Sequence, residues 1–273
     1  MTSAVGYAEV IGDPIAHSRS PLIHKHWLAE LGLNFDYRAT RVTRQELAAF
    51  VEGRRADSLW RGCNVTMPLK LDALMLADGT SDRAVAAGAA NILLPKDGAL
   101  LAGNTDVGAI LRLLADKERP DGVTLLGNGG AARAVLVALR MLDIADVRIQ
   151  ARDLSAAYKL AVEFGLGEQP VRFDEPIQTG GLINATPLGM AGFPPVHIDI
   201  GRMPANGWVF DMVTDPAETL LLKAAGERGL ATIDGITLLV EQAADSFMLL
   251  FGQEAPRRPD DALVARLREL EPQ

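Results

Sequence analysis

The sequence is poor in the residues that build disulfides and metal centres. Its single cysteine, Cys63, cannot form an internal disulfide, which favours a reducing compartment such as the cytoplasm. The four histidines show no metal-ligand spacing with each other or with this cysteine. His24 and His26, for example, are two residues apart, which places them on different faces of a helix. We therefore expect no metal centre.

The sequence also lacks the apolar segments of membrane and secreted proteins. No window approaches the roughly 20 consecutive apolar residues that cross a bilayer. Residues 1–6 have neither the basic nor the apolar region of a signal peptide. The formal charge of −8 argues against non-specific binding to nucleic acid. We expect a cytoplasmic protein, with neither membrane nor nucleic acid as a partner.

What remains is the composition of an ordinary globular protein. Hydrophobic residues make up 48% and charged residues 23% of a chain of 273 residues. That length suits about two domains with a core of normal size. Composition leaves the oligomeric state open between a monomer and a homodimer.

Strand and helix patterns alternate along the chain. Strands are expected at 8–12, 34–42, 62–66, 121–126, 147–150, 182–184 and 208–211. Helices are expected between them, with starts at Ser20-Pro21, where serine caps and proline follows, at Arg44 and at Ala131. An apolar helix over 236–251 and a charged one over 260–270 close the chain. This alternation predicts an α/β fold with parallel strands and helices on both faces of the sheet.

A glycine-rich turn after the strand at 121–126 predicts a dinucleotide site. The turn reads Gly127, Asn128, Gly129, Gly130, Ala131 and Ala132, which fits G-x-G-x-x-G/A. The glycines permit a tight turn and a close approach of pyrophosphate to the start of the next helix. The alternative is a plain strand–helix connection, but strand, glycines, helix and next strand follow in the required order.

The end of the following strand bears on the choice of cofactor. Arg152 suits a ribose 2′-phosphate, whereas Asp153 suits a free 2′-hydroxyl. The pair favours NADP(H) and leaves NAD(H) open.

Two short polar segments carry a candidate acid/base pair. Lys70 ends Asn64-Val65-Thr66-Met67-Pro68-Leu69-Lys70, and Asp106 ends Gly103-Asn104-Thr105-Asp106. Taken alone, Lys70 is a surface lysine and Asp106 a cap for a helix starting near Val107. Together with Asn64, Thr66, Asn91, Asn104 and Thr105, they suit a polyhydroxylated substrate and proton transfer.

At these residues the chain resembles the shikimate dehydrogenase family, which includes quinate/shikimate dehydrogenases. The segment from His17 to His24 is similar to the family's S-x-S-P-x-x-H, and 64–70 is similar to N-V-T-x-P-x-K. Segments 88–91, 103–106 and 184–190 resemble G-A-x-N, G-x-N-T-D and N-A-T-P-x-G-M. The resemblance covers almost the whole chain.

The resemblance implies two α/β domains with the active site in the cleft between them. An N-terminal substrate domain would comprise 1–106 and 238–273, and a Rossmann-type nucleotide-binding domain 107–237. The implied reaction is the reversible reduction of 3-dehydroshikimate to shikimate by NADPH.

The resemblance also assigns roles to residues. Lys70 and Asp106 would form the catalytic pair, and Ser18 and Ser20 would hold the substrate carboxylate. The ring hydroxyls would be oriented by Asn64, Thr66, Asn91 and Gln242. The cofactor would contact the glycine-rich turn and also Arg152, Thr186, Val213 and Gly235.

The chain departs from the family pattern at four positions. Thr214 replaces a tyrosine that touches the substrate, and Thr237 lies in a stretch that the family keeps near the nicotinamide. Lys25 replaces an asparagine, and Asp153 replaces a small hydroxyl residue. These changes leave two alternatives open: an NAD-dependent quinate or related ring-acid dehydrogenase, and a ligand-binding homologue with weak activity.

Overall fold

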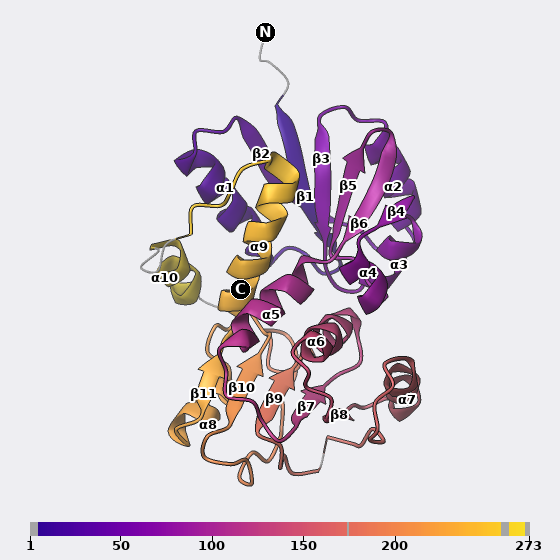
Figure 1. The fold of residues 1–273 in the computed structure, drawn as a ribbon. Helices are drawn as coiled ribbons and strands as arrows, with labels where there is room; N and C mark the ends of the chain where they lie inside the picture. The colour runs from indigo at the N-terminus through magenta and orange to yellow at the C-terminus, as the bar shows by residue number, and fades with distance from the viewer. Residues whose placement is uncertain (1–4, 174, 258–261, 271–273) are drawn as a thin grey trace. The chain divides into compact units, whose positions relative to one another are not determined.

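A computed structural model describes residues 5–173, 175–257 and 262–270 (Figure 1). The chain divides into two compact units, each with its own sheet. Unit 1 comprises Met1–Ala109 with Val240–Leu263, and unit 2 comprises Ile110–Leu239 with Val264–Gln273. These bounds differ from the expected domains by a few residues near 106 and 238, and they assign the end of the chain to unit 2.

Unit 1 holds a mixed sheet of six strands in the order β2-β1-β3-β5-β6-β4. The strands are β1 (Gly6–Gly12), β2 (Phe35–Arg41), β3 (Trp60–Val65), β4 (Gly79–Thr80), β5 (Ile92–Lys96) and β6 (Ala99–Gly103). β1 is parallel to β2 and β3, whereas β5 is antiparallel to β3 and β6. β5 and β6 form a two-residue hairpin, in which Asp97 and Gly98 both have the positive φ that such a turn requires, 52° and 82°.

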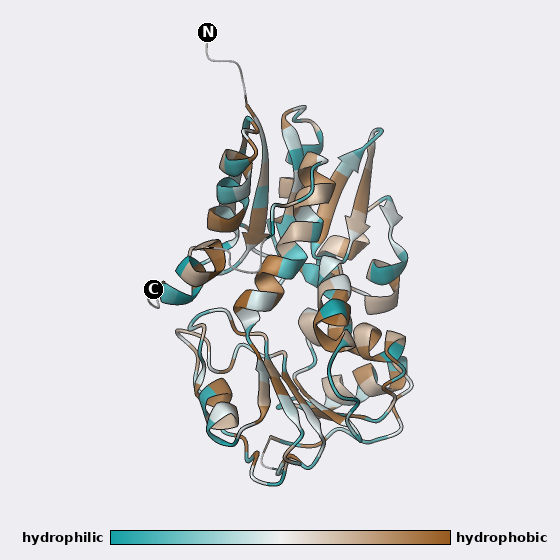
Figure 2. Ribbon diagram, turned by 60° about the vertical axis from the view of Figure 1, so that its left-hand side comes forward, coloured by the Kyte–Doolittle hydropathy of each residue, from teal (hydrophilic) through white to brown (hydrophobic). Residues whose placement is uncertain are grey.

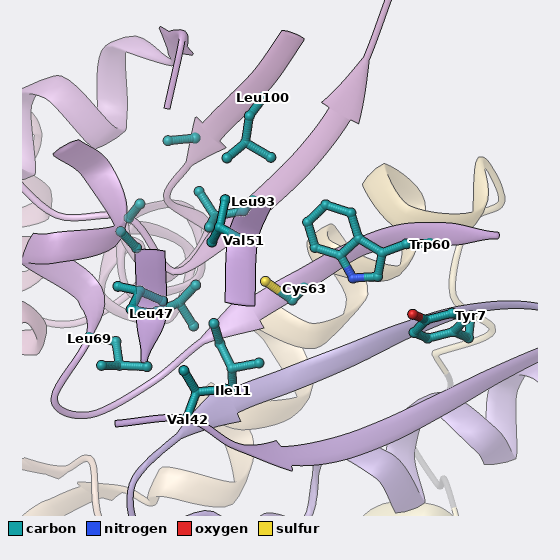
Figure 3. Packing of buried hydrophobic residues seen from close by; sticks show 14 residues of the cluster. Tyr7, Ile11, Val42, Leu47, Val51, Trp60, Cys63, Leu69, Leu93 and Leu100 are labelled. Carbon is teal, nitrogen blue, oxygen red and sulfur yellow. The ribbon is translucent and has the colours of Figure 1, made fainter. Parts of the chain in front are cut away.

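Helices cover both faces of this sheet. They are α1 (Ser20–Glu30), α2 (Leu47–Arg55), α3 (Lys70–Met75), α4 (Asp82–Ala87), the start of α5 (Thr105–Ala115) and most of α9 (Gly235–Phe251). Side chains of α2 and α3 pack with Ile11, Cys63 and Leu93 in one buried cluster (Figure 3). Successive strand residues face opposite sides, so Asn64, between Cys63 and Val65, faces away from this cluster and reaches α9.

Two helix starts in unit 1 differ from the expected ones. Ser20 is the first residue of α1 and Arg19 occupies the cap position, with Pro21 in the first turn as expected. α2 begins at Leu47, three residues after the expected Arg44. Residues 44–46 form a turn in which the Glu46 amide donates to the Thr43 carbonyl, and the Glu46 carboxylate accepts from the amide and hydroxyl of Thr43, as in a capping box at a helix start.

Unit 2 holds a five-stranded parallel sheet in the order β11-β10-β9-β7-β8. Its strands are β7 (Val123–Leu126), β8 (Val147–Gln150), β9 (Gly181–Asn184), β10 (Trp208–Asp211) and β11 (Ala231–Ile233). β7, β9 and β10 are buried throughout, which explains their apolar sequences (Figure 2). The chain winds from β7 to β8 on one side and to β9 on the other, which creates a topological switch point.

Three helices of unit 2 each follow one of its strands: α6 (Gly130–Met141) follows β7, α7 (Leu154–Glu163) follows β8 and α8 (Leu220–Glu227) follows β10. α10 (Ala262–Glu269) follows α9, and most of its residues belong to unit 2. The expected start of the last helix at Asp260 lies outside the described residues. In the part of the chain that the structure describes, no helix has the length and apolar character to span a membrane.

Candidate active site

The polar residues of unit 1 gather at one edge of its sheet for a topological reason. β3 ends at Val65 and β6 ends at Gly103, while β5 runs antiparallel to both and begins there, with Ile92 opposite Asn64 and Gly103. The segments after β3 and β6 and the segment before β5 are therefore neighbours. They carry Lys70, Asn91, Thr105 and Asp106.

Lys70 and Asp106 form an ion pair at this edge. The Lys70 Nζ donates to Asp106 Oδ2 over 2.5 Å, and the two side chains are 16% and 7% exposed. Lys70 is therefore not the freely solvated surface lysine that the sequence left as an alternative. The Lys70 side chain keeps partial contact with solvent.

Asp106 lies in the first turn of α5 but does not cap the helix. Asn104 is the cap, because its Oδ1 accepts from the amide of Val107 while its Nδ2 donates to the carbonyl of Ala89. The interpretation of Asp106 as a cap is therefore wrong. Its carboxylate is free for Lys70 on one oxygen and for Asn91 Nδ2, at 3.0 Å, on the other.

Asn91 is held with one orientation of its amide. Its Oδ1 accepts from the backbone amide of Thr105 at 2.7 Å, so its Nδ2 must point the other way. That nitrogen donates to the Thr105 hydroxyl and to Asp106, at 2.8 and 3.0 Å. The position of the catalytic candidate Asp106 thus depends on an asparagine held by three hydrogen bonds.

A second buried group adjoins this one. Asn64 Oδ1 accepts from the hydroxyl of Tyr37 at 2.7 Å, and Asn64 Nδ2 donates to Ser246 Oγ at 2.8 Å. Ser246 belongs to α9, one turn after Gln242. Sequence reasoning missed Tyr37 and Ser246, although the spacing of four residues between Gln242 and Ser246 places them on one face of a helix.

The other expected substrate residues lie on nearby segments. Thr66 follows β3, and its methyl group packs against Gly12 at the end of β1, where an added Cβ would lie 2.5 Å from it. Ser18 stands between β1 and α1, Ser20 is the first residue of α1, and Ser18 Oγ accepts from the amide of Ser20 at 3.4 Å. Among the described residues, no side-chain hydrogen bond joins Thr66, Ser18 or Ser20 to Lys70 or Asp106, so their place in the site stays a prediction.

In unit 2 the expected cofactor residues all follow the carboxyl ends of parallel strands. Gly127 comes directly after β7 with φ of +101°, a conformation that favours glycine. An added Cβ there would lie 2.8 Å from Thr186 Cγ2, so the turn also packs tightly on the segment after β9. Gly129 precedes α6, and nothing lies within 4 Å of where its Cβ would be.

This turn has the properties that a pyrophosphate needs. The first amides of α6 have no acceptor within the helix, and the helix start carries partial positive charge. Open space at Gly129 lets a ligand approach the backbone of Asn128, Gly130 and Ala131. The residues present therefore fit a dinucleotide.

Arg152 and Asp153 follow β8, and both are exposed. Asp153 caps α7, since its Oδ1 accepts from the amide of Ala156 at 3.0 Å. Its backbone carbonyl accepts from Asn128 Nδ2 at 3.5 Å, which links it to the glycine-rich turn. The Asp153 carboxylate therefore has a structural partner, a role that sequence reasoning did not anticipate.

A buried polar network fixes the segments after β9 and β10. Asn184 Nδ2 donates to Asp211 Oδ1 at 2.9 Å, and Asn184 Oδ1 accepts from the hydroxyl and amide of Thr186. Burial raises the pKa of the Asp211 carboxyl, against hydrogen bonds from Thr219, the Val213 amide and Asn184 that lower it. Thr186 and Val213 are thereby held in place.

Gly235 opens α9 beside the same network. An added Cβ there would lie 2.1 Å from the Val213 carbonyl oxygen, so only glycine allows the two segments to approach.

Among the described residues, no group of three or more His, Cys, Asp or Glu side chains is arranged to hold a metal ion.

Comparisons with known proteins agree with this architecture. Residues 10–93 match the family model for the shikimate dehydrogenase substrate binding domain. The shikimate dehydrogenase (NADP(+)) of Sphingopyxis alaskensis is 44% identical over 266 residues, 96% of this chain and 96% of that protein. The chain belongs to the shikimate dehydrogenase family.

Solved structures of the family are also similar. Shikimate 5-dehydrogenase from Thermus thermophilus, in complex with NADP(H) and shikimate, has a TM-score of 0.83 and 32% identity, covering 97% of this chain and 98% of that one. Quinate dehydrogenase from Corynebacterium glutamicum, in complex with NAD, has a TM-score of 0.81 and 29% identity. The match covers 97% of this chain and 98% of that one. The two α/β units are thus those of a shikimate dehydrogenase fold.

The structure also locates the departures from the family pattern. Lys25 is exposed on α1 and pairs with Asp36 at 3.1 Å. Thr237 bonds through its amide and hydroxyl to Asp234 Oδ1, at 2.7 and 3.0 Å. Thr214 is half-buried after β10. The Thr237 hydroxyl is thus part of the cap of α9, which ties its side chain to the protein.

Proposed function

We propose that this chain catalyses the reversible NADPH-dependent reduction of 3-dehydroshikimate to shikimate. The observation that carries the proposal is the Lys70–Asp106 pair, held by Asn91 at a sheet edge rich in neutral polar groups. Neutral amides and hydroxyls are suited to ring hydroxyls, and family membership supplies the class of substrate.

The substrate would be held by residues of unit 1. Ser18 and Ser20 would donate to its carboxylate, while Asn64, Thr66, Asn91 and Gln242 would bind its ring hydroxyls. Asn64 and Asn91 are each held by protein hydrogen bonds, and each Oδ1 accepts one of them and keeps a second lone pair for a ring hydroxyl. Preset polar groups orient a ligand without ordering cost at the moment of binding.

NADP(H) would be held by unit 2, and when bound it supplies or accepts the hydride. The pyrophosphate would lie at the start of α6, against Gly127, Asn128, Gly129, Gly130 and Ala131. Arg152 would contact the 2′-phosphate, and Thr186, Val213 and Gly235 would line the remainder of the site. The shape of the Gly127–Ala131 turn supports this placement.

Lys70 would move the proton. In the direction of reduction, the carbonyl carbon of the ketone gains the hydride, and its oxygen takes a proton from the Lys70 ammonium. The amine left behind is reprotonated by solvent, because the side chain is partly exposed. Asp106 keeps Lys70 in place and balances its charge; in oxidation every transfer runs in reverse.

Replacing Lys70 tests this role. Lys70→Ala should lower kcat by roughly 10²–10⁴, the usual contribution of a positioned acid or base. Shikimate affinity, measured by calorimetry, should change far less, because the neutral binding groups remain. Ser58→Ala, at an exposed turn of unit 1, is a matched control. Turnover by Lys70→Ala close to that of the control would exclude Lys70 as the acid/base.

A second candidate is an NAD-dependent dehydrogenase of quinate or a related ring acid. Asp153 beside Arg152 and the short Thr214 favour it, and the NAD-bound quinate dehydrogenase has a similar fold. Shikimate and quinate, each assayed with NADP⁺ and NAD⁺ at the reduced-nicotinamide band, decide between the two. Binding of shikimate without hydride transfer in any pairing would identify a ligand-binding homologue.

We propose a cytoplasmic setting, supported by the single buried Cys63, and a monomer or homodimer. Cell fractionation and light scattering on the purified protein test these two points.

A further inference from the structure

Ser246 is a fully buried residue of α9 whose hydroxyl meets three polar groups. Its Oγ lies 2.8 Å from Asn64 Nδ2, 3.2 Å from Thr105 Oγ1 and 3.0 Å from the backbone oxygen of Gln242. These three groups come from β3, α5 and α9, three elements of unit 1 that carry candidate substrate or acid/base residues. Ser246 joins them at one atom.

The direction of each bond follows from the chemistry of the groups. A backbone carbonyl only accepts, so Ser246 gives its single proton to the Gln242 oxygen. The Asn64 nitrogen only donates. Ser246 must therefore accept from Asn64, and a hydrogen bond with Thr105 runs from Thr105 to Ser246.

Thr105 completes the chain towards Asp106. Its Oγ1 accepts from Asn91 Nδ2, so its own proton has two possible acceptors: Ser246 Oγ at 3.2 Å and the side-chain Oε1 of Gln242 at 3.5 Å. A ligand hydroxyl that donates to Gln242 Oε1 would share the two lone pairs of that oxygen with Thr105. Ser246 offers Thr105 another acceptor.

We infer that Ser246 is a positioning residue for ring-acid binding, one that orients the Asn64 amide and releases the Gln242 side chain to the substrate. The inference rests on the proposed function, because it takes Asn64 and Gln242 as substrate-binding residues. Ser246 itself has no capacity left for the ligand, since its one proton and both acceptor positions are in use.

The test is Ser246→Ala in the full chain. Without the hydroxyl, Gln242 Oε1 is the acceptor left to Thr105 among the described side chains, and Asn64 loses its shorter acceptor. We expect the Kd and KM for shikimate to rise roughly three- to tenfold, the value of about one neutral hydrogen bond. The kcat should stay within about twofold, because Lys70 and Asp106 are untouched. The Kd for NADP⁺ should be unchanged.

Comparison with three further variants separates a positioning role of Ser246 from a role in folding stability alone. Ser246→Thr retains a hydroxyl and should restore much of the affinity, while Ser58→Ala controls for serine removal at an exposed site. A purely structural role would lower the active fraction and Tm and leave KM unchanged, which would overturn the inference. If the alanine variant does not fold, Ser246→Cys, whose thiol is a weak acceptor of similar size, carries the same prediction.

A double variant tests the release of Gln242. Once Gln242→Ala has removed the competing oxygen, adding Ser246→Ala should weaken shikimate binding by less than it does in the native chain. If the fold-losses of shikimate affinity in the two single variants multiplied fully in the double variant, the proposed effect of Ser246 on Gln242 would be overturned. Wild-type protein that binds no shikimate would refute the proposed function and the inference together, whereas tight binding that is equal in Ser246→Ala would refute the inference alone.

Discussion

At the scale of single residues, burial gives His24 an unusual environment. Its side chain is 1% exposed, stacks on Tyr37 with ring centroids 4.0 Å apart, and its Nδ1 has no hydrogen-bond partner among the described residues. Burial lowers the pKa of His24 to about 3. The ring therefore packs as a neutral aromatic group.

This burial predicts an acid-sensitive stability. The folded pKa of about 3 is below the ordinary value of 6.5, so the unfolded chain takes up the proton first. The stability from neutral His24 is complete above pH 6.5 and is lost as the pH falls towards 3. The loss is about 1.4 kcal/mol per pH unit within that window.

His24→Phe should remove this dependence, because it keeps the aromatic packing and cannot be protonated. Urea unfolding of both proteins at several pH values between 7.5 and 4.5 measures the effect. The difference in unfolding free energy between the two proteins should change by about 1.4 kcal/mol per pH unit, the effect of one proton. If the unfolding free energies of the two proteins changed with pH in the same way, His24 would not take up a proton on unfolding.

Asp153 bears on cofactor choice. Asp153→Asn keeps an oxygen for the Ala156 amide and removes the charge beside Arg152. NADP⁺ affinity should rise roughly three- to tenfold, since a like charge near a phosphate at a screened surface costs about 1 kcal/mol. NAD⁺, whose free 2′-hydroxyl suits the Asp153 carboxylate, should gain no affinity. Equal effects on the two cofactors in calorimetry would place the 2′-phosphate elsewhere.

At the scale of elements, the turn between β7 and α6 offers a matched pair of glycines. Gly127→Ala puts a Cβ at positive φ and 2.8 Å from Thr186 Cγ2, so it should cost about 1–3 kcal/mol of stability and weaken NADP⁺ binding. Gly129 has φ of −87° and open space, so Gly129→Ala should leave stability nearly unchanged. Its methyl group would still obstruct a pyrophosphate.

Thermal melts and NADP⁺ calorimetry on the two variants test this difference. Unit 1 does not contain the turn, so shikimate affinity should be the same in both. Normal NADP⁺ binding by Gly129→Ala would mean that phosphate does not approach the backbone there.

At the scale of the whole molecule, the two units should respond to different ligands. Shikimate at 100 times its Kd stabilises its binding unit by about 2.7 kcal/mol. Hydrogen exchange should therefore slow in β3, β5 and the start of α5 with shikimate alone, and in β7, α6 and β9 with NADP⁺ alone. Slowing of β7 and α6 by shikimate alone would contradict the assignment of the ligands to separate units.

The sequence alone determined the features that depend on neighbouring residues. The apolar strands of unit 2 and the glycine-rich turn at Gly127 were predicted, because strand burial and positive φ act through residue type and local order. The resemblance found Lys70 and Asp106, which the structure brings together. The hairpin at Asp97-Gly98 was missed, although the dipeptide is itself a turn signal.

Only the tertiary structure decided how distant residues combine. Asn104 takes the cap of α5 and frees Asp106 for Lys70, and Asp153 proves to be the cap of α7. Ser246 meets Asn64, 182 positions away, through packing of α9 on the sheet. A hydrogen bond forms only between atoms about 3 Å apart. The sequence pattern predicts which face of a helix or strand a residue lies on, but it does not predict which distant residue packs against that face.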